Sequence, residues 1–216
     1  MMFTLALGAI VIDGFRNNLD NSSVPTEEMM NNGLKDVEGF IIPVQSVSDV
    51  KQWMQLASTT GRKVYGFRIV PKKGKDPRVS VQQAIGFLKS KDFLGKNTTV
   101  FIDARHVMFG DDCKKNQRFV VEMYDELQMH LGGPKRIGVM TKKGLWTEKM
   151  CNMKWDNVKL WYVNHNKKPT FGDFTIFGGW MNPIAKQYDQ VTFQGKEGDN
   201  DVDYTYALDY FNDEPA

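Results

Sequence analysis

The chain has 216 residues, of which 41% are hydrophobic, and this is enough apolar material for the core of one large domain. Lysine and arginine together number 28 and aspartate and glutamate 26, so the formal net charge is only +2. That balance gives no reason to expect nucleic acid or an anionic membrane surface as a partner. We find no apolar run long enough to span a bilayer, no metal-binding spacing and no cofactor motif.

Two cysteines, Cys113 and Cys151, do not have the spacing of a zinc site. They could pair once, but a chain of this length needs no disulfide, so we expect both to be free thiols. The apolar start Met1–Ile12 lacks the cationic segment and the small-residue cleavage site of a signal peptide. We therefore interpret it as a first core strand and do not expect export.

The first two thirds of the chain alternate between short apolar runs and amphipathic segments. The runs predict strands at Gly8–Asp13, Gly39–Val44, Lys63–Val70, Thr98–Asp103 and Lys135–Met140. Helices are predicted between them: from Thr26 to Gly33, from Ser48 to Gly61, through Val81, Ile85 and Leu88, from Phe119 to Leu131, and over Trp146–Met150.

Beyond Met150 the pattern changes. Strands are predicted at Val158–Val163, Tyr188–Gln194 and Asp201–Tyr206, with little room for helices between them. Alternating strands and helices indicate a parallel α/β sheet, and eight strands favour its closure into a barrel. We find no repeat or linker that divides the chain. The expected fold is thus a single (β/α)8-like barrel with about five helices, covering residues 1–216.

Polar residues follow several predicted strands at their C-terminal ends, where barrel enzymes have their active sites. The candidate catalytic residues are Asp13, Asp103 and Asp203, which we expect to converge on one mouth. The candidate substrate-binding residues are Arg68, Arg105, Asn164, Trp161, Gln194 and Tyr204. Carboxylates and aromatic rings around a cleft are typical of a site that binds or cleaves a sugar chain. A single aspartate at a strand end, however, more often caps the following loop.

Short motifs spread over nearly the whole chain resemble one known family. Ile10–Gly14 is similar to a first strand that ends in an active-site aspartate, and Gly66–Arg68 to a strand with a glycine and aromatic residues. Leu160–Val163 resembles a Leu-Trp strand, Thr192–Gln194 a Trp-Gln-Tyr strand, and Asp201–Tyr204 a closing Val-Asp motif. The family is glycoside hydrolase family 25, the Chalaropsis-type and phage-type lysozymes. The resemblance implies a barrel of eight strands with fewer helices, acting on bacterial cell-wall glycan.

The chain departs from this family at the end of the fourth strand. There the family has Asp-x-Glu, and its glutamate is the general acid, whereas this chain has Arg105 two positions after Asp103. Arginine keeps its proton at any accessible pH, and loss of a general acid costs about 100-fold to 10,000-fold in rate. Because side chains alternate along a strand, Arg105 should form a salt bridge with Asp103, and His106 should face away. His165 and Glu197, both in loops, have weaker claims to replace the acid.

Three hypotheses follow. The first is a degenerate family 25 barrel that binds peptidoglycan or another polysaccharide, or that is a structural module of a cell-surface or phage virion assembly. In that setting we expect the chain in the virion, or in the host cytoplasm before release. The second is an active muramidase that hydrolyses β-1,4 bonds with a displaced acid. The third is an unrelated barrel enzyme that handles phosphate with Arg68 and Arg105, although no glycine-rich phosphate loop supports it.

The segment Lys167–Pro183 is rich in glycine and aromatic residues. The aromatic residues are Phe171, Phe174, Phe177 and Trp180. This composition suits either a lid over a glycan groove or a contact surface for another protein. We favour the contact surface, because so many aromatic rings in one loop would leave an apolar patch that a monomer tends to hide.

Overall fold

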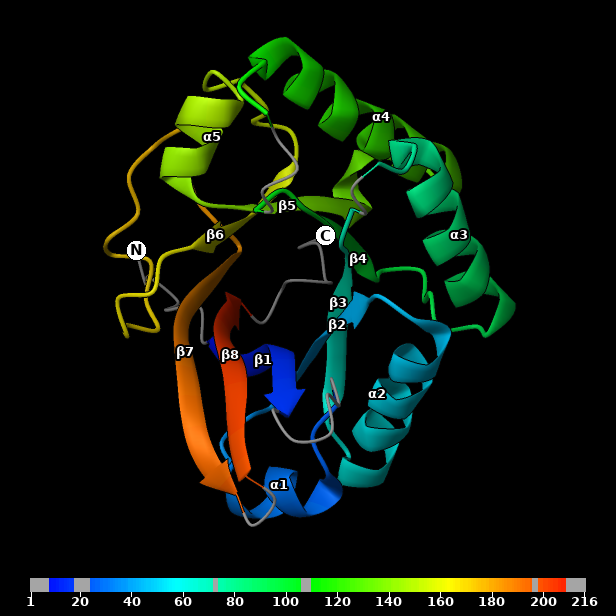
Figure 1. Ribbon diagram of the computed structural model, residues 1–216, viewed down its shortest axis with the longest axis vertical. Helices are drawn as coiled ribbons and strands as arrows, with labels where there is room; N and C mark the ends of the chain where they lie inside the picture. Colours follow the sequence, from blue (N-terminus) through cyan, green and yellow to red (C-terminus); the bar gives the residue numbers. More distant parts are fainter. Residues whose placement is uncertain (1–7, 18–23, 72–73, 106–109, 196–197, 209–216) are drawn as a thin grey trace, which may run out of the picture.

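The structure is a computed structural model that describes residues 8–17, 24–71, 74–105, 110–195 and 198–208. Within these residues, eight strands follow one another around a closed barrel in chain order. They are β1 (Gly8–Asn17), β2 (Gly39–Val44), β3 (Lys63–Ile69), β4 (Thr99–Asp103), β5 (Ile137–Thr141), β6 (Lys159–Val163), β7 (Ala185–Gly195) and β8 (Gly198–Leu208). Figure 1 shows these strands with the helices outside them. The predicted barrel is confirmed, whereas its extension over residues 1–216 as a single domain stays a prediction.

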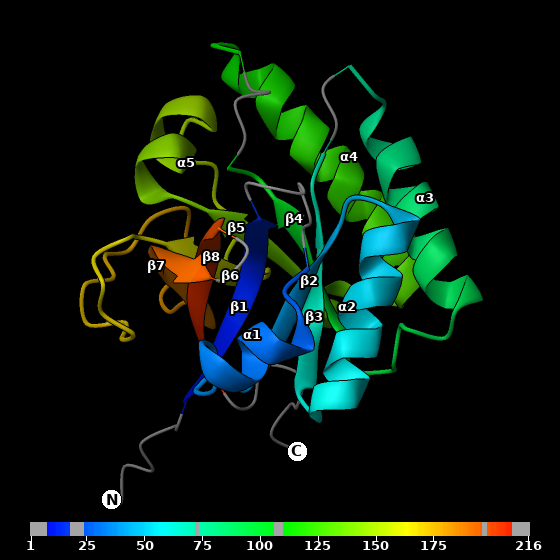
Figure 2. The same cartoon turned by 60° about the horizontal axis from the view of Figure 1, so that its bottom comes forward.

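The helices cover only part of the barrel. They are α1 (Glu27–Asn32), α2 (Val47–Thr60), α3 (Pro77–Ser90), α4 (Cys113–Leu131), the short 3-10 helix η1 (Pro134–Arg136) and α5 (Lys143–Lys149). Figure 1 and Figure 2 both show α2, α3 and α4 in succession around the outside of the strands. Among the described residues no helix follows β6, β7 or β8, as predicted. None of the helices described has both the length and the apolar character needed to cross a bilayer.

The ends of the helices follow local capping chemistry. The hydroxyl of Thr26 caps α1, as predicted. The cap of α2 is Ser46 rather than the predicted Ser48, because the Ser46 hydroxyl accepts a hydrogen bond from a first-turn N–H at 3.1 Å. Gly61 and Gly132 end α2 and α4 in the left-handed conformation, with φ of 65° and 76°, which glycine adopts at little steric cost.

Strand β8 runs against its neighbours. The pairs from β1 to β7 are parallel, but β8 pairs antiparallel with both β7 and β1. The prediction of an all-parallel sheet is therefore wrong at this strand. The reason is that only two residues separate β7 from β8, whereas a parallel pair needs a crossover of about a dozen residues. Because of the reversal, β8 begins at the mouth, and Asp203 lies at the middle of this strand, opposite Gly14 of β1.

Alternating side chains fill two separate cores. In β4, Phe101 points into the barrel, whereas Val100 and Ile102 pack against the surrounding helices. Inside the barrel, the rings of Phe101 and Trp161 meet edge to face, with centroids 5.2 Å apart. Gly138 on β5 leaves room for this contact, because a Cβ there would lie 2.3 Å from the Phe101 ring. The interior is thus packed with side chains, and polar groups are left to the layer at the mouth.

The segment between β6 and β7 folds onto the barrel. Phe177 and Trp180 are buried. Trp180 packs against Trp146 of α5, with centroids 4.9 Å apart, and its indole N–H donates to the carbonyl of Val158 at 2.7 Å. The expected apolar contact surface is therefore wrong for these two rings, because they complete the protein's own core.

Lys186 fastens the same segment to β7. Its side chain is fully buried, and Nζ lies within hydrogen-bond distance of four oxygens: Asn166 Oδ1 at 2.9 Å, the carbonyls of Lys168 and Thr170 at 3.0 and 2.9 Å, and the Asp173 carboxylate. Burial alone would raise the pKa of Asp173, but the hydrogen bond from Lys186 helps to hold that pKa below its ordinary value. A buried ammonium with four oxygen partners thus holds the segment in one conformation.

Cys113 and Cys151 form a disulfide, with their Cα atoms 5.8 Å apart. The prediction of free thiols is wrong, because chain length and spacing do not reveal that the start of α4 lies beside the end of α5. The side-chain amide of Asn116 joins the same two helix ends, since it donates to the carbonyl of Lys149 at 2.9 Å. The disulfide therefore links the start of α4 to the residues that follow α5.

Candidate functional site at the barrel mouth

A layer of buried polar side chains crosses the mouth of the barrel, next to the apolar inner core. Its members are Asp13 of β1, Arg68 of β3, Asp103 of β4, Gln187 of β7 and Thr205 of β8. Strand periodicity places them there. Asp13 lies two residues after Val11 and Asp103 two residues after Phe101, and both apolar side chains belong to the inner core.

Asp103 is held by two arginines. Arg105 donates to both carboxylate oxygens, from Nε at 2.9 Å and from Nη2 at 2.8 Å. Its backbone N–H adds a bond at 3.1 Å, and Nη1 of Arg68 adds another at 2.5 Å. Asp103 has no exposed surface, so these charge-assisted bonds replace its hydration. The predicted salt bridge between Asp103 and Arg105 is confirmed.

Arg105 cannot act as a proton donor in this arrangement. Burial lowers the pKa of its guanidinium, but the charge and hydrogen bonds of Asp103 outweigh burial and keep the pKa above the ordinary arginine value. The group stays a cation at every pH at which the protein is folded.

Asp13 occupies a different environment. It is fully buried and accepts hydrogen bonds from Nε2 of Gln187 at 2.8 Å and from the hydroxyl of Thr205 at 2.5 Å. Burial and the neighbouring charge of Asp203 raise the pKa of Asp13 to about 7, against the opposing influence of the two arginines. Asp13 therefore exchanges between its protonated and ionised forms near neutral pH.

Gln187 connects the two parts of the layer. Its Oε1 accepts a hydrogen bond from Nη1 of Arg105 at 2.8 Å, and its Nε2 donates to Asp13. Nε2 of His165 lies 3.0 Å from the same Oε1. Because a carbonyl oxygen only accepts, Nε2 of His165 carries the hydrogen in this contact. His165 is exposed, so its imidazole lies at the surface of the mouth.

Sequence reasoning missed Gln187 and Thr205, and it ranked His165 low. The seventh strand was predicted to begin at Tyr188, one residue after Gln187. Lys186 and Gln187 are both polar, and two consecutive polar residues do not indicate a buried strand. A usable signal was the period of two. Gln187 follows the inner-core residue Ala185 by two positions, and Thr205 precedes the inner-core residue Ala207 by two.

Asp203 lies beside the layer, over Gly14. A Cβ on Gly14 would come within 2.6 Å of Oδ2 of Asp203, so the glycine allows β1 and β8 to approach at this point. Arg68 links the other two predicted acids, since it donates to the Asp13 carbonyl at 2.8 Å and also pairs with Asp103. The structure thus brings all three predicted acids to one mouth.

Two predicted substrate-binding rings do not face the mouth. Trp161 is fully buried in the inner core, under the polar layer. Tyr204 lies on the outer face of β8, where its ring centroid is 6.2 Å from that of Tyr188. Strand alternation explains this placement, because the next residue, Thr205, points inward. Neither ring can stack on a ligand at the mouth, so the structure corrects both assignments.

The remaining predicted site residues are not part of the polar layer that the structure describes. Asn164 follows β6 and its side-chain amide donates to Asp173 at 2.7 Å, so it belongs to the loop rather than to the polar layer. The side chain of Gln194 lies outside the described residues, as do His106 and Glu197. Within the described part of the chain, no three His, Cys, Asp or Glu side chains are grouped as metal ligands.

Comparison with known proteins identifies the family. A family model described as Lysozyme-like protein 1 matches residues 44–188, about two thirds of the chain. The chain belongs to this lysozyme-like family. It is 30% identical over 146 residues to Counting factor 45-1 of Dictyostelium discoideum, covering 66% of this chain and 48% of that protein. It is 29% identical over 105 residues to the probable GH family 25 lysozyme 5 of the same organism, covering 47% and 45%. The lysozyme-like chain thus spans about half the length of these curated relatives.

The fold agrees with this assignment. The structure of a family GH25 lysozyme from Aspergillus fumigatus superposes with a TM-score of 0.61 at 16% identity, over 91% of this chain and 93% of that one. The lysozyme-like chain is therefore a distant member of the family 25 type, as the sequence motifs predicted. The alternative of an unrelated phosphate-handling barrel is wrong.

Proposed function

We propose that this lysozyme-like chain binds a polysaccharide at the mouth of its barrel and does not hydrolyse it. Cell-wall glycan is the ligand that the family suggests, since the relatives include a probable GH family 25 lysozyme. The observation that carries the proposal is the pairing of Arg105 with Asp103 at the strand end where the family resemblance calls for a general acid.

The chemistry of hydrolysis supports this reading. Cleavage of a glycosidic bond requires a proton for the leaving oxygen, and a positioned acid contributes about 100-fold to 10,000-fold in rate. Asp103 accepts four hydrogen bonds from two arginines and is completely buried, so it acts as an ionised acceptor. The pair stabilises the mouth without supplying a proton.

The partly exposed groups of the mouth suit sugar hydroxyls. Arg105 retains two N–H bonds beyond the three that its side chain uses, and 14% of its side chain is exposed. Asp203 and His165 also reach the surface. Planar donors and acceptors of this kind pair with the hydroxyl groups of a pyranose ring and fix its orientation.

A second candidate function is residual muramidase activity, and the environment of Asp13 favours it. A carboxyl whose pKa is raised to about 7 by burial is chemically suited to general acid catalysis near neutral pH. The burial that raises this pKa also keeps Asp13 from solvent, and both of its oxygens already accept hydrogen bonds. We therefore place binding first.

The disulfide indicates the kind of compartment in which the protein functions. Disulfides persist in oxidising surroundings, so the Cys113–Cys151 bond favours a site outside the cytoplasm, such as a cell surface or an extracellular particle. Membership of a larger assembly, including a phage virion, stays a prediction.

The test combines cleavage and binding with the same preparations. Release of reducing ends from purified peptidoglycan is measured for the wild type, for Arg105→Glu and for Arg78→Glu, a control that changes an exposed arginine on α3 in the same way. We expect no release from the wild type or the control. Release of reducing ends by Arg105→Glu would show that the absence of a general acid at position 105 is sufficient to explain the inactivity of the wild type.

Binding is judged by co-sedimentation with insoluble peptidoglycan. We expect the wild type to be retained and Arg105→Ala to be retained less, while its unfolding midpoint is checked to exclude general damage. Release by the wild type that disappears in Asp13→Asn would establish the second candidate instead. Absence of both release and retention would reject binding to this polymer.

A further inference from the structure

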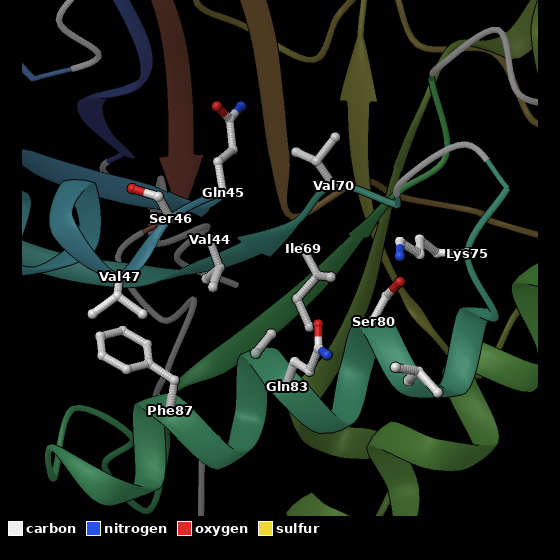
Figure 3. Close-up of a pocket in the computed structure, with 12 residues that line it drawn as sticks. Val44, Gln45, Ser46, Val47, Ile69, Val70, Lys75, Ser80, Gln83 and Phe87 are labelled. Carbon is white, nitrogen blue, oxygen red and sulfur yellow. The ribbon is translucent and has the colours of Figure 1, made fainter.

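A groove lies on the outside of the barrel, at the rim formed by the ends of β2 and β3. Its volume is about 430 Å³, and α3 forms the opposite wall. Figure 3 shows Val44 and Ile69 pointing from the strand ends toward Gln83 and Phe87 of α3. Ile69 and Arg68 are neighbours on opposite faces of β3, so the groove is separate from the polar layer inside the mouth.

The two ends of the groove differ in chemistry. One end is apolar, with Phe87 facing Val47, whose exposed fraction is 51%. At the other end Lys75 and Ser80 line the groove, and the Ser80 hydroxyl donates to the carbonyl of Asp76 at 3.2 Å. The side-chain amides of Gln45 and Gln83 add polar groups to the lining.

Charge decides which ligand fits. The lining contains one cation, Lys75, and no carboxylate. In the described part of the chain no ion pair or hydrogen bond engages the Lys75 ammonium, so it remains available to an anionic group. The only aromatic ring of the lining, Phe87, lies at the apolar end, away from Lys75. The groove therefore favours a ligand with an apolar body, amide groups and one terminal carboxylate.

We propose that this groove binds a short aliphatic peptide by its free C-terminal carboxylate. The carboxylate pairs with Lys75, the backbone amides pair with Gln83 and Gln45, and the small side chains cover Val44 and Ile69. Ser80 and Phe87 are seven residues apart on α3, a rise of about 10 Å, which an extended peptide of about three residues spans. Nothing in this proposal depends on polysaccharide binding at the mouth.

The test is an NMR titration of the isotopically labelled full chain with three probes: tri-alanine, its C-terminal amide and chitotriose. We expect tri-alanine to bind with millimolar affinity and to shift the resonances of the groove. The amide should bind about fivefold more weakly, which corresponds to the loss of one partly exposed ion pair of about 1 kcal/mol. Lys75→Gln should weaken the binding of tri-alanine by the same factor and leave the binding of the amide unchanged.

Two further variants keep the result unambiguous. Lys51→Gln removes an exposed lysine of α2 that does not line the groove, and it should bind like the wild type. Gln83→Trp should fill the groove and abolish binding while the unfolding midpoint is retained. Equal affinities for the acid and the amide, no saturation by tri-alanine up to about 10 mM, or shifts in the groove with chitotriose alone would each overturn the proposal.

Discussion

Asp13 makes the stability of the protein depend on pH in a way that one substitution should remove. Its pKa is raised from 3.8 to about 7 in the folded protein, chiefly by burial. In the window between these two values the folded state binds a proton that the unfolded state has released. The stabilisation is therefore complete below the unfolded pKa and is lost as the pH rises through the folded pKa.

The size of the effect follows from the shift. A difference of about 3 pKa units corresponds to about 4 kcal/mol, of which about 3 kcal/mol should be lost between about pH 5 and about pH 8. The variant Asp13→Asn lacks the titrating group but keeps the shape. Its amide oxygen can still accept from Gln187, and its NH2 group can donate to the Thr205 hydroxyl.

The assay is guanidinium chloride unfolding of both proteins across this pH range. With an m-value of about 5 kcal/mol/M, the wild-type midpoint should fall by about 0.5 M more than that of Asp13→Asn as the pH rises. Taking the difference cancels other groups that titrate in the same range. If the two midpoints change in parallel with pH, the reasoning is refuted, because Asp13 would then not hold a proton in the folded state.

Two predictions concern the scaffold. Lys186→Met should destabilise the fold by about 3 kcal/mol in thermal or chemical unfolding, because it leaves the Asp173 carboxylate and its neighbouring oxygens without their cation. The control Lys168→Met changes an exposed side chain in the same segment and should leave the stability nearly unchanged. Reduction of the Cys113–Cys151 disulfide, which spans 38 residues, should cost about 4 kcal/mol, and thiol reagents should label the native protein only after reduction. Labelling before reduction, or equal losses in the two lysine variants, would contradict these assignments.

Local patterns in the sequence were sufficient for the framework of the barrel. Apolar runs of strand length alternate with helical periods over the first five units, and the period of two directs Asp13 and Asp103 inward. The motifs that indicated family 25 are also local, and so is the Arg105 that departs from them. Periodicity and motif spacing report on neighbours within about ten residues, and these features need no more than that.

Only the tertiary structure decided which distant groups meet at the mouth. Gln187 donates to Asp13 across 174 residues, and Thr205 donates to it across 192. The pairing of β8 with both β7 and β1 determines these contacts, and the reversal of β8 brings Asp203 to the mouth. A raised pKa for Asp13 depends on this enclosure, because burial arises from the closed barrel as a whole and not from the residues next to it in the chain.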